Sequence, residues 1–338
     1  MRLLFIGFGT VVQGLSELLA EKATELKQKH GLDLKVVGIS DMLKGCVYAP
    51  DGIDLAQALE AAKNGDLKQL PNQFEADALA MIDAADADLM VEATYTDIKT
   101  GQPATSHIKA ALAKGMHVTT TNKGPVALFL QELKKLADAN GVKFLYEGTV
   151  ISGTPLLNLI RETLAGSHIS EIKGILNGTT NYILSQMEQG QPYDAVLKKA
   201  QELGYAEAVP DADVLGWDAL AKITILANAV FGVDAKPDAF SCQGITEISN
   251  DAIAEAKANG KRFKLIGTLK RDGDSVVGSV APVQMDLSHP LAGVMGATNA
   301  VTISTDTLGD VTIVGPGAGR VETGYSVLID IISIGGSR

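Results

Sequence analysis

The chain has 338 residues, of which 46% are hydrophobic and 20% charged, so it can form two hydrophobic cores and has the composition of a globular protein. Its formal net charge of -11 argues against nucleic acid or an anionic membrane surface as the main partner, because both bind clustered Lys and Arg. Its two cysteines, Cys46 and Cys242, lack disulfide or metal-ligand spacing, which favours a reducing cytoplasm. We expect neither export nor a membrane span, because the apolar opening is too short for a signal peptide and no long uncharged apolar run follows.

The first part of the chain alternates strand and helix patterns. Strands are predicted within residues 2–10, 33–41, 87–94, 117–122 and 142–148, and helices within 12–31, 106–115 and 127–141. This alternation predicts a doubly wound, Rossmann-like parallel sheet with helices on both faces, over residues 1–150. The polar, helix-prone stretch 51–76 is predicted to be an insertion over that sheet.

After residue 150 the pattern changes. A helix over 154–165 is predicted, then a strand near 168–178, two helices, and β-rich stretches at 264–285 and 300–315. We therefore expect a second, mixed α+β domain for substrate binding and dimerisation at 151–308. The closing stretch 309–338 is predicted to be a glycine-rich turn followed by a helix that returns to the first domain.

The first predicted strand runs directly into glycines. Gly7, Gly9 and Val12 occupy the three positions of the G-x-G-x-x-G pattern. Gly7 would allow the tight turn, and Gly9 would let backbone N–H groups approach a pyrophosphate at the helix N-terminus. Val12 in place of the third glycine would only loosen the packing of helix on strand. A purely structural turn is the alternative, but the position after a first strand favours a dinucleotide site.

The identity of the dinucleotide stays open at the end of the second predicted strand. Asp41 stands where a carboxylate accepts from the ribose 2′-OH of NAD and repels the 2′-phosphate of NADP. Lys44, three residues later, could instead pair with a 2′-phosphate if the loop folds inward.

Two opposite charges interrupt an apolar helical pattern at residues 216–226. Asp218 and Lys222 are four residues apart, so a helix places them on one face. Such a pair is commonly solvated and contributes only about 0.3 to 0.5 kcal/mol to stability. The alternative is a catalytic pair, because a desolvated lysine can exchange a proton near neutral pH.

Seven segments resemble one known family, in the same order along the chain. They are GFGTVVQGL, TTTNKGPVA, EGTVISGTPLL, KGILNGTTNYIL, LGYAEAVPDADVLGWDALAK, HPLAGVMGATNAV and GPGAGRVETGYSVL. By these segments the chain resembles homoserine dehydrogenases over nearly its whole length. The resemblance implies reversible oxidation of L-homoserine to L-aspartate 4-semialdehyde with NAD or NADP, on the route to threonine, methionine and isoleucine. It also implies a Rossmann domain followed by mixed dimerisation and substrate regions.

The resemblance assigns catalytic roles to two lysines. Lys222 would move the proton of the substrate hydroxyl, with Asp218 beside it in the same pocket. Lys123, at the end of a predicted strand, would lie beside both cofactor and substrate and act as a second catalytic or orienting group. An exposed loop lysine is the alternative for Lys123.

Substrate binding is implied for Glu207, Asp213, Asp218, Thr179 and Thr180. The two threonines could also cap a helix. The acidic loop departs from the usual family pattern, because Val209 replaces an Asp, Asp211 follows the proline and Leu215 replaces a common Glu. These changes put substrate affinity and even substrate identity in doubt.

The remaining sites implied by the resemblance concern the cofactor and a cation. Cofactor contacts are expected at Gly7, Phe8, Gly9, Thr10, Val11, Asp41, Lys44, Thr94, Lys123, Gly317 and Gly319. A sodium ion would be held by oxygen atoms of Glu147, Val150, Ser152 and Thr154, mostly backbone carbonyls. A tight hinge between domains explains the glycines of that stretch equally well.

The resemblance also predicts a homodimer formed through the mixed β region. Regulation by an ACT domain is not expected, because the chain ends soon after the last predicted helix. Two other functions remain open: an inactive dinucleotide sensor, and a dehydrogenase acting on a related amino acid. An aspartate-semialdehyde dehydrogenase is disfavoured, because neither cysteine stands in a nucleophile's context.

Overall fold

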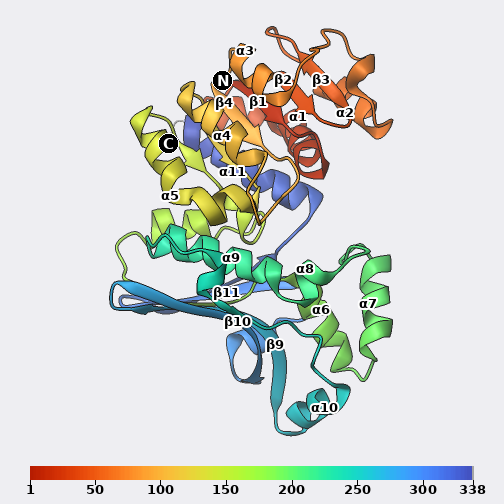
Figure 1. Ribbon diagram of the computed structural model, residues 1–338, viewed down its shortest axis with the longest axis vertical. Coiled ribbons are helices and arrows are strands. Elements are labelled where there is room, and N and C mark those ends of the chain that lie inside the picture. Colours follow the sequence, from red (N-terminus) through yellow and green to blue (C-terminus); the bar gives the residue numbers. More distant parts are fainter. Residues whose placement is uncertain (337–338) are drawn as a thin grey trace. The chain divides into compact units, whose positions relative to one another are not determined.

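The computed structural model describes residues 1–336 and divides the chain into two compact units (Figure 1). The first unit contains Met1–Gly153 and the chain from Gly319 onward, and the second contains Thr154–Ala318. The expected closing segment 309–338 is thus shared between the units, because its first strand pairs within the second unit. Within residues 1–336, no helix is both long and apolar enough to cross a membrane.

The first unit is built on a six-stranded sheet in the order β3-β2-β1-β4-β5-β6. Its strands are β1 (Arg2–Ile6), β2 (Lys35–Asp41), β3 (Gly45–Tyr48), β4 (Leu89–Glu92), β5 (His117–Thr120) and β6 (Phe144–Leu145). All pairs are parallel except β2 with β3, an antiparallel hairpin that the sequence patterns did not predict. Apolar β1 is buried in the middle, which confirms the predicted parallel sheet of a Rossmann-like domain.

The helices of this unit are α1 (Thr10–His30), α2 (Leu55–Lys63), α3 (Ala78–Ala84), α4 (Ala104–Ala113), α5 (Lys123–Ala139) and α11 (Arg320–Gly335). The last helix, α11, packs directly on α1, although some 300 residues separate them (Figure 1). Two glycines allow this close approach. A Cβ on Gly14 would lie 2.2 Å from Arg320 O, and one on Gly324 would lie 2.5 Å from Leu15 N. The two helix backbones are therefore almost in contact.

The second unit contains a six-stranded sheet in the order β12-β11-β7-β9-β10-β8. Its strands are β7 (Ile169–Ile175), β8 (Ser241–Cys242), β9 (Lys261–Asp272), β10 (Ser275–Asp286), β11 (Thr298–Thr305) and β12 (Gly309–Pro316). Its helices are α6 (Gly178–Met187), α7 (Tyr193–Glu202), α8 (Asp211–Val214), α9 (Trp217–Val230) and α10 (Asn250–Ala258). The helix predicted over 154–165 is wrong in extent and type, because only a short π-helix, Leu159–Thr163, forms there.

Helix α9 covers one face of this second sheet (Figure 1). A Cβ on Gly267 of β9 would touch Ile223 of α9, and Val280, its partner on β10, is buried. Side chains of alternate residues point to the opposite face. On that face Val277 and Val283 of β10 are 53% and 38% exposed. The sheet is therefore covered on one side and open along β10 on the other.

Candidate active site

The glycine loop after β1 has the geometry of an anion-binding turn. Gly7 has a φ of +91°, and a Cβ there would lie 2.5 Å from Ala93 O, so only glycine fits. Gly9 precedes α1, which has no side-chain cap, and a Cβ on Gly9 would meet nothing within 4 Å. The N–H groups of the first turn, including those of Thr10 and Val11, lack helical acceptors and face this open space. The loop therefore fits a dinucleotide pyrophosphate.

Val12 occupies the position of the third glycine in the pattern. Its side chain is fully buried and packs in the hydrophobic core beneath α1, with Leu15 and Phe5. The substitution thus leaves the open glycine loop unobstructed.

Asp41 ends β2 with its carboxylate turned toward the glycine loop. Its Oδ2 accepts from Phe8 N at 2.8 Å, and its Oδ1 accepts from the N–H groups of Leu43 and Lys44, both at 3.0 Å. Lys44 Nζ lies 3.5 Å from the same carboxylate. Burial alone raises the pKa of Asp41, but the hydrogen bonds from Phe8 and Lys44 and the charge of Lys44 outweigh it, so the pKa is lowered. The carboxylate is therefore ionised beside the loop.

Thr94 and Lys123 follow the neighbouring strands β4 and β5. A Cβ on Gly7 would lie 2.9 Å from Thr94 N, so Thr94 adjoins the glycine loop. Lys123 is half-buried at the first position of α5, where Asn122 caps the helix by accepting from Gly124 N at 3.2 Å. Thr94, Lys123 and the glycine loop thus share the carboxyl edge of the sheet.

In the second unit, Asp218 and Lys222 form a buried ion pair. Lys222 Nζ lies 2.7 Å from Asp218 Oδ2 and donates to Leu176 O at 2.6 Å. The side chains are 7% and 17% exposed for Lys222 and Asp218. The solvated-pair alternative is therefore excluded: the apolar residues of α9 bury a lysine that carries two oxygen partners.

Asn177 is the residue that the sequence patterns missed. Its Nδ2 donates to Asp213 Oδ1 at 2.6 Å and to Asp218 Oδ2 at 3.0 Å, and its Oδ1 accepts from Thr180 N at 2.9 Å. It therefore joins the two carboxylates and caps α6. Its place before the NGTTNY helix was the available signal, because Asn is a favoured N-cap residue.

The predicted substrate residues are not all equally near this cluster. Burial raises the pKa of Asp213, and the nearby Asp218 adds to the effect while Asn177 opposes it. Thr179 donates to Tyr205 O at 2.5 Å and Thr180 is fully buried, but the helix cap is Asn177 and neither threonine. By contrast, Glu207 is exposed, and its carboxylate makes no hydrogen bond to the Asn177 cluster within residues 1–336.

The acidic loop around Glu207 carries the substitutions noted in the sequence. Val209 is 73% exposed, and Asp211 begins the short helix α8. Leu215 follows α8, and its carbonyl accepts from Cys242 Sγ at 3.4 Å. Val209 is thus open to solvent, whereas Leu215 lies at the end of a helix.

The predicted sodium loop is buried. Glu147, Val150, Ser152 and Thr154 are each less than a tenth exposed, and Ser152 has a φ of +56°. Among the described residues, no group of three or more His, Cys, Asp or Glu side chains could hold a metal ion. A site built from backbone carbonyls stays a prediction.

Gly317 and Gly319 belong to different units. A Cβ on Gly317 would lie 2.2 Å from the Asn299 amide, whereas Gly319, with a φ of +139°, precedes α11. Position 317 thus requires glycine because the Asn299 side chain lies so close, and position 319 favours glycine because of its positive φ.

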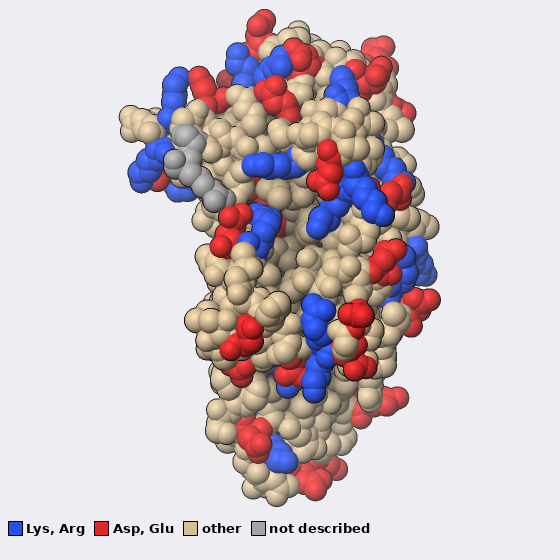
Figure 2. Space-filling model, turned by 90° about the vertical axis from the view of Figure 1, so that its left-hand side faces the viewer, with Lys and Arg blue, Asp and Glu red and all other residues tan. Residues whose placement is uncertain are grey.

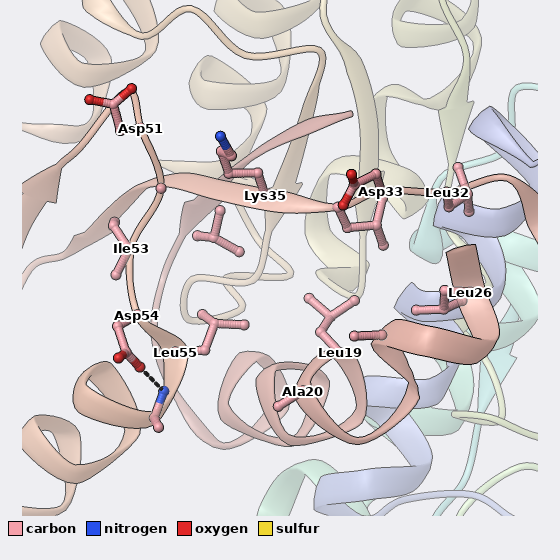
Figure 3. Close-up of a pocket in the computed structure, with 15 residues that line it drawn as sticks. Leu19, Ala20, Leu26, Leu32, Asp33, Lys35, Asp51, Ile53, Asp54 and Leu55 are labelled. Atoms are coloured by element: carbon pink, nitrogen blue, oxygen red, sulfur yellow. Dashed lines mark hydrogen bonds between the residues drawn. The ribbon is translucent and has the colours of Figure 1, made fainter. Parts of the chain in front are cut away.

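A cavity of about 540 Å³ lies elsewhere in the first unit, between α1, the start of β2 and residues 51–56 (Figure 3). Leu19, Leu26, Ile53 and Leu55 line it. Because it adjoins the amino end of β2, it is separate from the glycine loop and from Asp41 at the carboxyl end. It contains none of the predicted site residues.

Charged side chains are mixed on the face that Figure 2 shows. Among the described residues there, Lys and Arg alternate with Asp and Glu and do not gather into one basic patch.

The whole chain matches one family. The model for homoserine dehydrogenase matches residues 155–332, and that for the NAD binding domain of homoserine dehydrogenase matches residues 7–147. An NAD(+)-dependent homoserine dehydrogenase of Pseudomonas canavaninivorans is 45% identical, over 98% of this chain and 96% of the relative. The homoserine dehydrogenase of Methanocaldococcus jannaschii is 40% identical, over 99% and 98%.

Solved structures agree with these sequence matches. A homoserine dehydrogenase of Thiobacillus denitrificans has a TM-score of 0.86 at 31% identity, covering 99% of this chain and 73% of that one. A hyperthermophilic archaeal homoserine dehydrogenase in complex with NADPH has a TM-score of 0.85 at 30% identity, covering 98% and 97%. The chain belongs to the homoserine dehydrogenase family.

Proposed function

We propose that this protein interconverts L-homoserine and L-aspartate 4-semialdehyde with a nicotinamide dinucleotide, a step of amino-acid biosynthesis. Family membership over the whole chain supports the reaction. The observation that carries the chemistry is Lys222, buried on α9 within 2.7 Å of Asp218. A buried lysine with a carboxylate neighbour is suited to exchange a proton with a bound hydroxyl.

The roles follow from the reaction. When bound, the nicotinamide would supply the hydride acceptor for the alcohol carbon, and the chain's own residues would have to accept the hydroxyl proton. The amine form of Lys222 takes that proton during oxidation, and its ammonium form returns it during reduction. Asp213 and Asp218, joined through Asn177, supply negative charge that attracts the substrate ammonium group. Lys123, at the same carboxyl edge of the sheet as the glycine loop, orients the reacting groups at the cofactor.

We propose NAD as the preferred cofactor. The ionised Asp41 carboxylate would accept from ribose hydroxyls and repel a 2′-phosphate. Lys44 is already paired with Asp41 at 3.5 Å, which weakens it as a phosphate partner. The Pseudomonas canavaninivorans relative is named as NAD(+)-dependent, whereas the archaeal structure contains NADPH, so the family includes both.

We further infer a cytoplasmic homodimer. Both cysteines are free thiols, which suits a reducing compartment. The open face along β10 offers exposed apolar side chains, Val277 and Val283, for pairing with a second copy.

We also propose a sodium ion at the 147–154 loop. Its presence would show as a dependence of activity on NaCl that choline chloride does not reproduce.

The test of the reaction is a spectrophotometric assay of purified protein with L-homoserine and either NAD or NADP. We expect reduced nicotinamide to accumulate with homoserine, faster with NAD. Serine and threonine serve as control substrates. Tight cofactor binding without homoserine turnover in either direction would contradict the proposal and favour a dinucleotide sensor, whereas turnover of another amino alcohol would move the substrate assignment.

A further inference from the structure

A buried carboxylate lies under the cofactor edge of the first unit. Glu92, the last residue of β4, is fully buried. A buried carboxylate is costly unless several donors satisfy it. Its partners therefore indicate what it does.

These donors come from the two strand ends that form the cofactor edge. Glu92 Oε1 accepts from the Thr94 hydroxyl and from Thr94 N at 3.3 Å. The Thr120 hydroxyl is shared between the backbone oxygen of Glu92 at 2.9 Å and Oε2 at 3.2 Å. His107 Nδ1 of α4 lies 3.6 Å from Oε1, beyond hydrogen-bond distance. The Glu92 carboxylate thus links the residues after β4 to the end of β5.

The network continues to the start of α5. Asn122 N donates to Thr120 Oγ1 at 3.0 Å, and Asn122 Nδ2 donates to Tyr95 O at 2.9 Å. Asn122 caps the helix whose first residue is Lys123. The positions of Thr94 and Lys123 are therefore coupled through buried hydrogen bonds that end at Glu92.

We propose that Glu92 is a positioning residue for the dinucleotide, acting through the hydroxyl of Thr94. Because that hydroxyl gives its proton to Glu92, its oxygen presents only lone pairs to the glycine-loop side. Thr94 then accepts from a ribose hydroxyl or a carboxamide N–H of the cofactor. This inference rests on the proposed use of a nicotinamide dinucleotide and adds to it a residue that never touches the ligand.

The test is a double-mutant cycle on NADH binding, measured by fluorescence titration of the purified full chain. The variants are Glu92→Gln, Thr94→Val and the double variant. Each single change should raise the Kd for NADH about 5- to 20-fold, since a neutral amide forms a weaker bond than a carboxylate and valine forms none. The double variant should bind about as weakly as Thr94→Val alone, because Glu92 acts through Thr94.

Two controls separate positioning from general stability. Asp330→Asn removes another buried carboxylate of the same unit, which accepts from Thr119 Oγ1 at 2.8 Å. It should lower the melting temperature, yet its effect on the Kd should add to that of Thr94→Val. Thr94→Ser keeps the hydroxyl and should bind NADH within about threefold of the unmodified chain.

Additive effects of Glu92→Gln and Thr94→Val, or an unchanged Kd in folded Glu92→Gln, would overturn the inference while leaving the proposed function intact. Failure of the unmodified chain to bind NADH would overturn both. If Glu92→Gln does not fold, the comparison of Thr94→Val with Thr94→Ser decides, because equal affinities would contradict a role for the hydroxyl.

Discussion

Asp41 turns its carboxylate back onto the glycine loop, where Phe8 N donates to it at 2.8 Å. The sequence placed an acid at the end of β2 but left the cofactor open, because Asp41 favours NAD whereas Lys44 could pair with the 2′-phosphate of NADP. The structure shows the carboxylate already bonded by three backbone N–H groups and paired with Lys44. We therefore propose that this one side chain sets the selectivity against a 2′-phosphate.

Replacing Asp41 by Ser should shift the cofactor preference toward NADP. The change removes the repelling charge and frees Lys44 to pair with a 2′-phosphate. We expect the ratio of kcat/KM for NADP to that for NAD to rise by at least about tenfold.

The control for this change is Asp33→Asn, which removes an exposed acid at the other end of the same strand region. It should leave the ratio unchanged. An Asp41→Ser variant that keeps the original ratio would show that another residue sets the preference.

Sequence patterns identified only some of the individual site residues. Lys222 and Asp218 were found because four-residue spacing on a helix is visible in the sequence. Asn177 and Glu92 were missed because their partners are either distant in sequence, as with Asp213 and Asp218, or packed across neighbouring strands. Such contacts depend on which elements become neighbours.

Among the elements, those with strong periodicity were predicted best. The largely apolar β1 and the amphipathic α1 formed where expected, because burial and spacing alone specify them. The hairpin strand β3 was missed, since four residues show too little alternation. The helix predicted over 154–165 was wrong in extent and type, because the structure forms a π-helix at Leu159–Thr163.

Strand β9 carries a lysine that should make stability depend on pH. Lys264 is fully buried, and its Nζ donates to Asn181 Oδ1 at 2.8 Å and to Val294 O at 2.5 Å. Burial, with a smaller effect of Arg262, lowers the pKa of Lys264 from 10.5 to about 8. The unfolded chain therefore keeps a proton that the folded chain loses between pH 8 and 10.5, so this residue's contribution to stability rises with pH in that window.

Lys264→Met should remove this dependence. The free energy of unfolding in urea is measured for both proteins at pH 7.5 and at pH 9.5. From the lower to the higher pH, we expect the unmodified chain to gain about 1 to 2 kcal/mol relative to the variant. Lys270→Met, on an exposed residue of the same strand, should give no such change. A stability difference that is independent of pH would contradict an altered Lys264 pKa.

At the scale of the whole molecule, the predicted fold class is confirmed. The parallel sheet followed from the alternation of strands and helices, and the mixed second sheet from the β-rich stretches after residue 264. Strand order in the second sheet could not be derived, because β7 pairs with β9 and β11, strands that follow it by about 90 and 130 residues. Nothing in local patterning selects those partners.

The open face of the second sheet should mediate dimerisation. Val277→Lys places a charge among the exposed apolar side chains of β10 and should shift the protein toward monomer in analytical ultracentrifugation. Leu79→Lys alters an exposed apolar residue on α3 and should leave the assembly unchanged. A monomeric unmodified protein, or a dimer indifferent to Val277→Lys, would contradict this interface.

We propose that Lys222 moves the hydroxyl proton, and the kcat of Lys222→Met in homoserine oxidation tests this role. We expect kcat to fall about 10²- to 10⁴-fold, as for loss of a general acid–base group, with the Kd for NADH unchanged. A kcat within a few-fold of the unmodified protein, in a folded variant that binds NADH normally, would contradict the role of Lys222.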